Sequence, residues 1–460
     1  MTKTLTCLSP IDGSVFAERE TLDMDTARAR IARARAAQSA WAARPLQDRI
    51  DLVMAGVAAV GAMNDDIVPE LAWMMGRPVR YGGEFGGFDE RARHMAGIAE
   101  AALGDIHVGE DAGFKRYIRR IPHGVVFVVA PWNYPYMTAI NTVAPALIAG
   151  NTVVLKHATQ TLLVGERMVR AFREAGMPED VFVNVFLDHD TTAGLIAENA
   201  FDFVNFTGSV GGGRAMERAA AGTFTGLGLE LGGKDPGYVM EDADLDAAVD
   251  TLIDGAMFNS GQCCCGIERI YVHENLFDTF LEKAKTVVEA YVLGNPLDPA
   301  TTLGPMAHSR FADVVRDQIA EAVARGATPV IDTGRFDDDG GAYLAPQILI
   351  DVDHAMTVMR EESFGPVVGV MKVSSDAKAV ALMNDSAFGL TASLWTRDLD
   401  RAVRVGDRIE TGTVFMNRAD YLDPGLCWTG CKNTGRGGGL SIIGYHNLTR
   451  PKSYHLKKVT

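Results

Sequence analysis

The hydrophobic pattern changes character near residue 123. Before that point apolar residues recur at i, i+3, i+4 and i+7, which predicts one apolar helix face; these residues are Ile50, Val53, Met54, Val57 and Val60. The Arg- and Ala-rich stretch 26–43 predicts a second helix, with Asp25 as its N-cap. We therefore expect the first hundred residues to be largely helical.

After residue 123, short and continuously apolar segments alternate with helical patterns. Segments that are apolar on both faces predict strands of a parallel sheet covered by helices. The predicted strands are 125–130, 152–156, 181–186 and 203–206, with a helix at 162–175. Such sheets bind ligands beyond the carboxyl ends of their strands.

A second α/β segment follows residue 265. Its predicted strands are 269–273, 367–371 and 412–417, and residues 295–299 and 336–341 read as turns or surface loops. The tail, residues 450–460, is basic and alternating, which predicts an exposed strand able to pair with another chain.

Length and composition narrow the class of protein. A chain of 460 residues is expected to form two or three domains, and 47% apolar with 22% charged residues is typical of a globular protein. A net charge of −15 argues against nucleic acid or an anionic membrane as a partner. No apolar run approaches ~20 residues, and the first ten residues lack the apolar core of a signal peptide. With only six cysteines and no signal, we expect a cytoplasmic enzyme.

Three consecutive cysteines, Cys263, Cys264 and Cys265, are the main candidates for chemistry. A thiol is partly ionised near neutral pH and strongly nucleophilic. Adjacent cysteines rarely converge on one metal ion, and no second cysteine or histidine pair follows at zinc-site spacing, so no metal is expected. A disulfide framework does not suit so long a chain. Burial as inert thiols is the favoured interpretation for Cys263 and Cys265 but not for Cys264.

Three further segments could support such a nucleophile. Glu230 lies in an apolar, glycine-flanked stretch and could serve as a general base. Asn133, between two prolines and two aromatic residues, could donate to an oxyanion. The Gly-rich segment 206–213 follows a strand and opens a helix, where backbone N–H groups can hold a pyrophosphate, although it is not the G-x-G-x-x-G fingerprint. Each signal alone is weak.

Six motifs in one order carry a resemblance to a known family. They are Pro131-Trp-Asn-Tyr-Pro135, Ala144-Pro-Ala-Leu-Ile-Ala-Gly-Asn-Thr-Val-Val-Leu-Lys156, Phe206-Thr-Gly-Ser209, Glu230-Leu-Gly-Gly-Lys234, Gly261-Gln-Cys-Cys264 and Glu362-Ser-Phe-Gly-Pro366. Their order and spacing resemble the NAD(P)-dependent aldehyde dehydrogenase superfamily, from residue 9 to residue 436.

The resemblance implies an aldehyde dehydrogenase-like α/β fold. A Rossmann-type cofactor domain would comprise residues 1–103 and 123–232, and an α/β catalytic domain residues 233–435. A small β oligomerisation arm would comprise residues 104–122 and 446–460 and would pair across subunits, giving a homodimer or homotetramer.

The resemblance also implies a mechanism. Cys264 would attack the aldehyde, the oxyanion would be held by the Asn133 amide and the backbone N–H of Cys264, and Glu230 would activate the water that hydrolyses the thioester. The cofactor would be NAD or NADP. Its binding residues would be Trp132, Lys156, Thr159, Gly208, Ser209, Gly213, Leu231, Glu362 and Phe364.

Departures from the family pattern bear on the cofactor and on proton transfer. Thr159 replaces a glutamate that many NAD-preferring members place against the ribose 2′-hydroxyl, which favours acceptance of NADP. Asp188 and Asp190 would oppose an extra phosphate if they point inward. Thr142 and Gly437 replace a lysine and a glutamate that form a relay in many relatives, which suggests another proton route to Glu230.

The expected aldehyde pocket is mixed and partly polar. It would be lined by Tyr134, Thr138, Asn141, Phe258, Cys263, Cys265 and Tyr421. Asp420 and Asp423 lie in a loop that often contacts the substrate tail, where an inward carboxylate would favour a cationic amino-aldehyde; both could equally be surface residues. Arg418 in the same loop argues for the opposite charge preference.

Two other functions compete with hydrolytic oxidation of an aldehyde. A CoA-acylating aldehyde dehydrogenase would generally lack the base at Glu230. A catalytically silent structural or scaffolding homologue is disfavoured because Cys264, Glu230 and Asn133 are all present.

Overall fold

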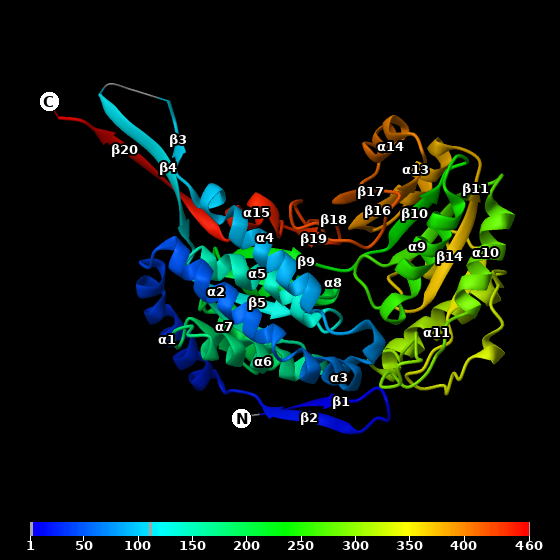
Figure 1. Cartoon of the computed structure of the whole chain (residues 1–460), viewed down its shortest axis with the longest axis horizontal. Helices are drawn as coiled ribbons and strands as arrows, with labels where there is room; N and C mark the ends of the chain where they lie inside the picture. The colour runs from blue at the N-terminus through cyan, green and yellow to red at the C-terminus, as the bar shows by residue number, and fades with distance from the viewer. Residues whose placement is uncertain (1–2, 110–112, 460) are drawn as a thin grey trace.

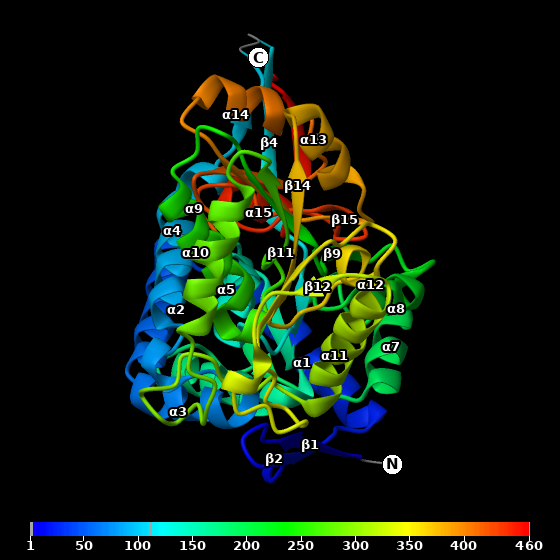
Figure 2. The same ribbon diagram turned by 90° about the vertical axis from the view of Figure 1, so that its right-hand side faces the viewer.

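Two twisted sheets organise the chain, and a narrow β arm projects from one side (Figure 1). This computed structural model describes residues 3–109 and 113–459. Seen from the side, the helices lie on both faces of the sheets (Figure 2). The alternating α/β pattern predicted from the sequence is confirmed.

The first sheet has the strand order β19-β9-β8-β5-β6-β7, and it is parallel except for the edge strand β19. The strands are β5 (Val125–Ala130), β6 (Thr152–His157), β7 (Phe182–Asn184), β8 (Phe203–Thr207), β9 (Gly226–Glu230) and β19 (Gly435–Arg436). All six residues of β5 are buried, because alternate side chains enter two different cores. The strand therefore needs apolar residues on both faces.

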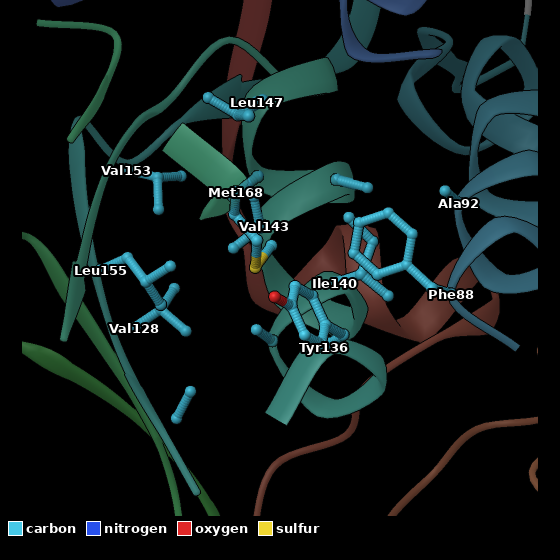
Figure 3. Close-up of a cluster of buried hydrophobic side chains, with 14 of the residues drawn as sticks. Phe88, Ala92, Val128, Tyr136, Ile140, Val143, Leu147, Val153, Leu155 and Met168 are labelled. Atoms are coloured by element: carbon cyan, nitrogen blue, oxygen red, sulfur yellow. The ribbon is translucent and has the colours of Figure 1, made fainter. Parts of the chain in front are cut away.

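One face of this sheet is covered by α2 (Leu46–Gly61), α4 (Phe85–Leu103), α5 (Pro135–Ile148) and α6 (Leu162–Glu174). Figure 3 shows part of this core, where Phe88 from α4 meets Tyr136 and Ile140 from α5. Val128 and Leu155 reach it from the sheet. The other face is covered by α1 (Met24–Ala42), α7 (His189–Ala197) and α8 (Val210–Ala220).

The second sheet has the order β12-β13-β14-β11-β10-β16-β17 and is parallel except for β12. Its strands are β10 (Asp235–Val239), β11 (Ile267–His273), β12 (Thr328–Pro329), β13 (Gln347–Ile350), β14 (Val367–Val373), β16 (Thr391–Trp395) and β17 (Thr413–Met416). Its helices are α9 (Leu245–Met257), α10 (Phe277–Glu289), α11 (Ser309–Ala324), α12 (Thr357–Arg360), α13 (Asp376–Asn384) and α14 (Leu399–Gly406).

The arm is an antiparallel sheet of β20 (Thr449–Lys457), β4 (Phe114–Pro122) and β3 (Ile106–His107). It carries the C-terminus away from the body of the molecule (Figure 1). The tail predicted as a strand is therefore a strand, and it pairs with β4 of its own chain. Helix α15 (Ser441–Asn447) connects the arm to the first sheet's helices.

The remaining helix is α3 (Asn64–Met75). The other elements are short: the antiparallel pair β15 (Phe388–Gly389) and β18 (Cys431–Lys432), and the 3-10 turns η1 (Val79–Tyr81), η2 (Thr159–Thr161), η3 (Phe258–Gly261) and η4 (Thr333–Arg335).

The expectation that the first hundred residues are largely helical is confirmed, although they open with a β-hairpin, β1 (Thr4–Leu8) and β2 (Val15–Glu20), that was not predicted. The predicted N-cap of the first helix was wrong. The N-cap of α1 is Asp23, whose carboxylate accepts from the backbone N–H of Thr26 at 2.8 Å. Asp25 lies in the first turn instead and pairs with Arg28 at 2.8 Å. Both aspartates favour a helix start, and the capping geometry selects the earlier one.

Within the described ranges, no single helix is long and apolar enough to cross a membrane. One bent pair, α2 and α3, meets the requirement of length and composition only when the two are joined across a 68° bend.

Candidate active site

A groove of about 830 Å³ runs past the carboxyl ends of β5, β6, β8 and β9. This is the edge where a parallel sheet is expected to bind a ligand. Predicted residues that line it are Trp132, Asn133, Lys156, Thr159, Gly208, Ser209, Glu230, Leu231, Cys264, Glu362 and Phe364. The three candidate catalytic residues thus reach one groove from separate segments of the chain. Gly213 lies just outside, where a β-carbon would meet the Leu231 side chain at 2.6 Å.

Cys264 follows a strained turn that aims it into the groove. Asn259 and Ser260 both adopt left-handed backbone angles, with φ of 54° and 57°, an uncommon conformation for residues other than glycine. The three sulfurs of the cysteine run lie within 4.8 Å of one another. The neighbouring Cys263 and Cys265 thiols hold the pKa of Cys264 well below its usual value. Cys264 is therefore the thiol of the three that ionises most readily.

Asn133 is fixed by the same turn. Its side-chain Nδ2 donates one N–H to the backbone carbonyl of Gln262 at 3.2 Å, which leaves its second N–H for a ligand. Its own backbone carbonyl accepts from Arg77 Nη2 at 2.5 Å. Arg77 in turn pairs with Glu84 at 2.6 Å, and both side chains are almost fully buried.

The Arg77–Glu84 pair was missed by sequence reasoning. Glu84 also accepts from the backbone N–H of Met137 at 2.7 Å, so the pair holds both ends of the loop around Asn133. Charged residues seven positions apart in a loop carry no pattern that predicts a buried pair. Arg77 follows α3 and Glu84 caps α4, and the two side chains meet only in the folded chain.

Glu230 ends β9 with its carboxyl group enclosed. Thr207 donates to its Oε2 at 3.4 Å, and a β-carbon on Gly439 would lie 3.0 Å from its Oε1. Burial, together with the nearby Cys264, raises the pKa of Glu230 to about 7. A carboxyl group with this pKa can exchange a proton at neutral pH.

A second, narrow cavity of about 10 Å³ opens beside Glu230, away from the groove. That is room for about one water molecule. Asn141 and Thr142 line it, together with Gly438 and Gly439. Asn141 therefore lies beside this cavity, not beside the groove, and it accepts from Arg91 at 3.5 Å.

The loop at 362–364 is anchored by a buried ion pair. Glu268 accepts from Lys234 and also from the backbone N–H groups of Ser363 and Phe364 at 2.8 and 2.9 Å. Glu362 accepts from the backbone N–H of Gly233 at 2.9 Å, and burial raises its pKa to about 8. Lys234 was quoted only as part of a motif, and Glu268 was missed.

Aromatic side chains form one wall of the groove. Trp132 stacks on Phe311 with ring centroids 5.2 Å apart and meets Phe364 edge-on at 5.5 Å. Phe311 belongs to α11, and the groove is also lined there by His308, Arg310 and Val314. These residues, together with Thr6 and Leu8 of the N-terminal hairpin, were not predicted, because nothing in their local pattern relates them to β5 or β6.

At the far end of the groove, Lys156 is buried on β6, and burial lowers its pKa to about 8. Its ammonium group has no hydrogen bond or ion pair within residues 3–109 and 113–459, so it is available to a ligand. Asp188 caps α7 through the backbone N–H of Thr191 and pairs with Lys3 at 2.7 Å. Asp190 is exposed. Neither carboxylate lines the groove.

The other residues predicted for the pocket have partners outside the groove. Tyr134 lies under the Arg77 guanidinium at 4.7 Å, and the Thr138 hydroxyl donates to the Tyr134 carbonyl at 2.6 Å. Phe258 meets Tyr81 edge-on at 4.9 Å. Tyr421 donates to Glu90 at 2.8 Å, and the Arg418 guanidinium lies 3.5 Å from its ring centre.

Asp420 and Asp423 take different positions. Asp423 is exposed and its carboxylate accepts from the backbone N–H of Gly425. Asp420 turns inward and accepts from the thiols of Cys263 and Cys265 at 3.2 and 2.9 Å. Burial raises the pKa of Asp420 to about 7. The interpretation of Asp420 as a surface residue was therefore wrong.

Comparison with known proteins places this arrangement among characterised relatives. A family model described as the aldehyde dehydrogenase family matches residues 1–454. A 3,6-anhydro-alpha-L-galactose dehydrogenase of Streptomyces coelicolor is 34% identical, covering 99% of this chain and 93% of the relative. A betaine aldehyde dehydrogenase of Rhizobium leguminosarum is 33% identical over 98% of this chain and 93% of the relative.

The chain is also similar to solved structures along almost its whole length. An NADP-dependent glyceraldehyde-3-phosphate dehydrogenase of Bacillus halodurans, complexed with NADP, has a TM-score of 0.93 and 31% identity, covering 99% of this chain and 96% of that one. PnpE in complex with nicotinamide adenine dinucleotide has a TM-score of 0.94 and 30% identity over 99% and 94% of the two chains.

Proposed function

Because this chain belongs to the aldehyde dehydrogenase family and uses NAD or NADP, we propose that it oxidises an aldehyde to a carboxylic acid through a thioester on Cys264. The observation that carries the proposal is the convergence of Cys264, Asn133 and Glu230 on one groove. A nucleophile, an oxyanion donor and a buried base are the three groups that this reaction requires.

In the first step the Cys264 thiolate adds to the aldehyde carbon. The aldehyde oxygen becomes an oxyanion. It accepts hydrogen bonds from the free N–H of the Asn133 side chain and from the backbone N–H of Cys264. The bonds that hold Asn133 in place, to Gln262 and through Arg77, keep this donor oriented before the aldehyde arrives. A nicotinamide cofactor held beside Glu362 and Phe364 would supply the hydride acceptor by which the adduct on Cys264 is converted to a thioester.

In the second step Glu230 removes a proton from a water molecule that attacks the thioester, and the Cys264 thiolate leaves. A carboxylate with a pKa of about 7 is matched to this task near neutral pH. The narrow cavity beside Glu230 supports a water-mediated route for the proton, since Thr142 and Gly437 replace the charged pair of many relatives.

The groove suits the cofactor at several positions. Lys156 offers an unpaired ammonium group to the ribose hydroxyls. Ser209 caps the N-terminus of α8, and the glycines that follow leave the backbone N–H groups there accessible to phosphate. Glu362 and Phe364 would orient the nicotinamide ribose and ring, and Trp132 and Leu231 line the groove. Thr159 in place of a carboxylate supports acceptance of NADP, and the carboxylate of Asp188 is already neutralised by Lys3.

For the substrate we propose a polar aldehyde, with a cationic amino-aldehyde favoured by Asp420. Its Oδ1 accepts from both neighbouring thiols, while its Oδ2 has no hydrogen-bond partner among the described residues. A betaine aldehyde dehydrogenase is among the relatives. A half-buried carboxylate with one free oxygen favours a positively charged substrate over a negatively charged one.

The division of labour between domains is also a proposal. Residues 1–103 and 123–232 would bind the cofactor and residues 233–435 would carry the nucleophile, although β19 at 435–436 pairs with the first sheet. The arm, residues 104–122 and 446–460, would join a homodimer or homotetramer, and light scattering of the intact chain against a chain ending at residue 445 would test this.

The function is tested by following reduced nicotinamide with NAD and with NADP. The aldehyde panel should include amino-aldehydes, aldehyde acids and neutral aldehydes, with and without CoA. We expect turnover that is lost in Cys264→Ala and kept in the matched control Cys431→Ala. A requirement for CoA, or no reduction with any aldehyde, would overturn the hydrolytic proposal.

A further inference from the structure

The cysteine run and Asp420 bring four donor atoms of metal-binding type together. The sulfurs of Cys263, Cys264 and Cys265 lie within 4.8 Å of one another, and those of Cys263 and Cys265 are 3.6 Å apart. Asp420 Oδ1 lies 3.2 Å from the first of these two sulfurs and 2.9 Å from the second. Although adjacent cysteines rarely converge on one metal ion, this turn brings the three sulfurs close together.

The carboxylate of Asp420 is held there without a cationic partner. Within residues 3–109 and 113–459 it forms no ion pair, and its only hydrogen bonds come from two thiols, which are weak donors. Its backbone is left-handed, with φ of 49°. A half-buried carboxylate in this setting is stabilised by a cation.

We propose that Cys263, Cys264, Cys265 and Asp420 form a binding site for one thiophilic divalent cation, such as Zn²⁺, and that the bound ion blocks the enzyme reversibly. Cys264 is the nucleophile of the proposed function, and a sulfur that ligates the ion cannot attack an aldehyde. The metal site itself does not depend on that function; only its inhibitory consequence does.

The observed spacing is close to what tetrahedral coordination needs. Zinc–sulfur bonds of about 2.3 Å place two sulfur ligands about 3.8 Å apart, and a zinc–oxygen bond of about 2.0 Å places oxygen about 3.5 Å from sulfur. The Cys263–Cys265 separation of 3.6 Å needs almost no change. Asp420 must retreat by a few tenths of an ångström, and Cys264 must rotate inward from its place beside the groove.

The surroundings offset part of the negative charge. Arg91 is buried and interacts electrostatically with Cys264 and Cys265. One of its nitrogens, Nε, has no hydrogen-bond partner in the part of the chain that the structure describes, and its Nη1 donates to the Met137 carbonyl at 3.0 Å. A guanidinium in this position stabilises thiolate ligands without itself competing for the ion.

Binding is a ligand exchange. Each thiol that ligates the ion releases its proton to solvent as the metal–sulfur bond forms, and no electrons are transferred. The ion and the aldehyde both require the Cys264 sulfur, so each excludes the other. The block is expected to be relieved by a chelator and weakened by aldehyde.

Cobalt(II) provides a spectroscopic probe that does not depend on turnover. The reduced enzyme should take up one Co²⁺ per chain, with sulfur-to-metal charge-transfer absorption and the visible bands of a tetrahedral ion. Zn²⁺ should displace it in a titration with a chromophoric chelator. Absence of these bands, or binding of a hydrated ion without them, would overturn the proposal.

The ligand set is tested by substitution. Cys263→Ser and Cys265→Ser should each weaken Zn²⁺ binding by at least about 100-fold, and Asp420→Asn by at least about tenfold. Cys431→Ser, which removes a thiol outside the cluster, should bind as the wild type does. If a serine variant melts at a lower temperature than the wild type, Cys263→Ala and Cys265→Ala are used to repeat the test. Wild-type affinity in all these variants would mean capture by Cys264 alone and would contradict the four-ligand site.

Discussion

The buried pair Lys234–Glu268 should be one of the most sensitive points of the molecule. Glu268 accepts from the Lys234 ammonium and from two consecutive backbone N–H groups, those of Ser363 and Phe364. Lys234 also donates to the Ser363 hydroxyl at 2.9 Å. The side chains of the pair are 0% and 5% exposed, so no solvent replaces a lost partner. The substitution Glu268→Gln keeps the shape and removes the charge.

We expect Glu268→Gln to lower the free energy of unfolding by about 3–5 kcal/mol, because an ammonium group is left buried without its counter-ion. Burial already lowers the pKa of Lys234, and loss of Glu268 lowers it further. Where the folded variant holds Lys234 neutral, the unfolded chain binds one more proton. Stability of the variant should therefore rise with pH, by about 1.4 kcal/mol per pH unit, until the unfolded lysine also loses its proton near pH ~10.4.

The same substitution should loosen the segment that is proposed to hold the nicotinamide ribose. The KM for the cofactor is expected to rise more than kcat falls, because the backbone of Ser363 and Phe364 loses its acceptor. Urea unfolding at several pH values, followed by tryptophan fluorescence, measures the stability change. The control is Glu274→Gln on the surface, expected within about 0.5 kcal/mol of the wild type. A loss below about 1 kcal/mol with no added pH dependence would refute the reasoning.

Three further predictions concern the groove. The rate of thioester hydrolysis should rise as pH passes through 7 and level off above it, because Glu230 is proposed to act as its carboxylate and its pKa is raised to about 7. A profile of kcat against pH checks this, and a flat profile would contradict it. Gly232→Ala should lower kcat/KM for the cofactor on the order of 100-fold, because the new β-carbon would meet the Glu362 carboxylate. Unchanged kinetics would show that Glu362 does not position the cofactor. Thr159→Glu should reduce kcat/KM for NADP relative to NAD by at least about tenfold, through repulsion of the 2′-phosphate; equal loss for both cofactors would place the 2′-position elsewhere.

Much of the fold could be predicted because its strands are buried on both faces. The range of β5 was predicted to the residue, since six consecutive apolar residues leave no other interpretation. The hairpin of β1 and β2 was missed because its strands are short and rich in polar residues, and only alternate side chains are covered. The hydrophobic pattern of a sequence reflects which side chains are buried, and these two strands bury few side chains.

The residues that support the site were harder to predict than those that line it. Cys264, Glu230 and Asn133 lie in motifs whose composition already suggests chemistry. Glu268 and the Arg77–Glu84 pair act through partners far along the chain, so their role exists only once the sheets have packed. Asp420 could be oriented only from the structure, because a left-handed residue in a loop reverses the direction of its side chain.

The central claim is that Cys264 forms a thioester that Glu230 then hydrolyses, and rapid mixing tests it most directly. With saturating cofactor and aldehyde, Glu230→Gln should give one reduced nicotinamide per active chain in a burst and then almost stop. Cys264→Ala should give no burst. Full steady turnover in Glu230→Gln, or a burst that survives Cys264→Ala, would contradict the account.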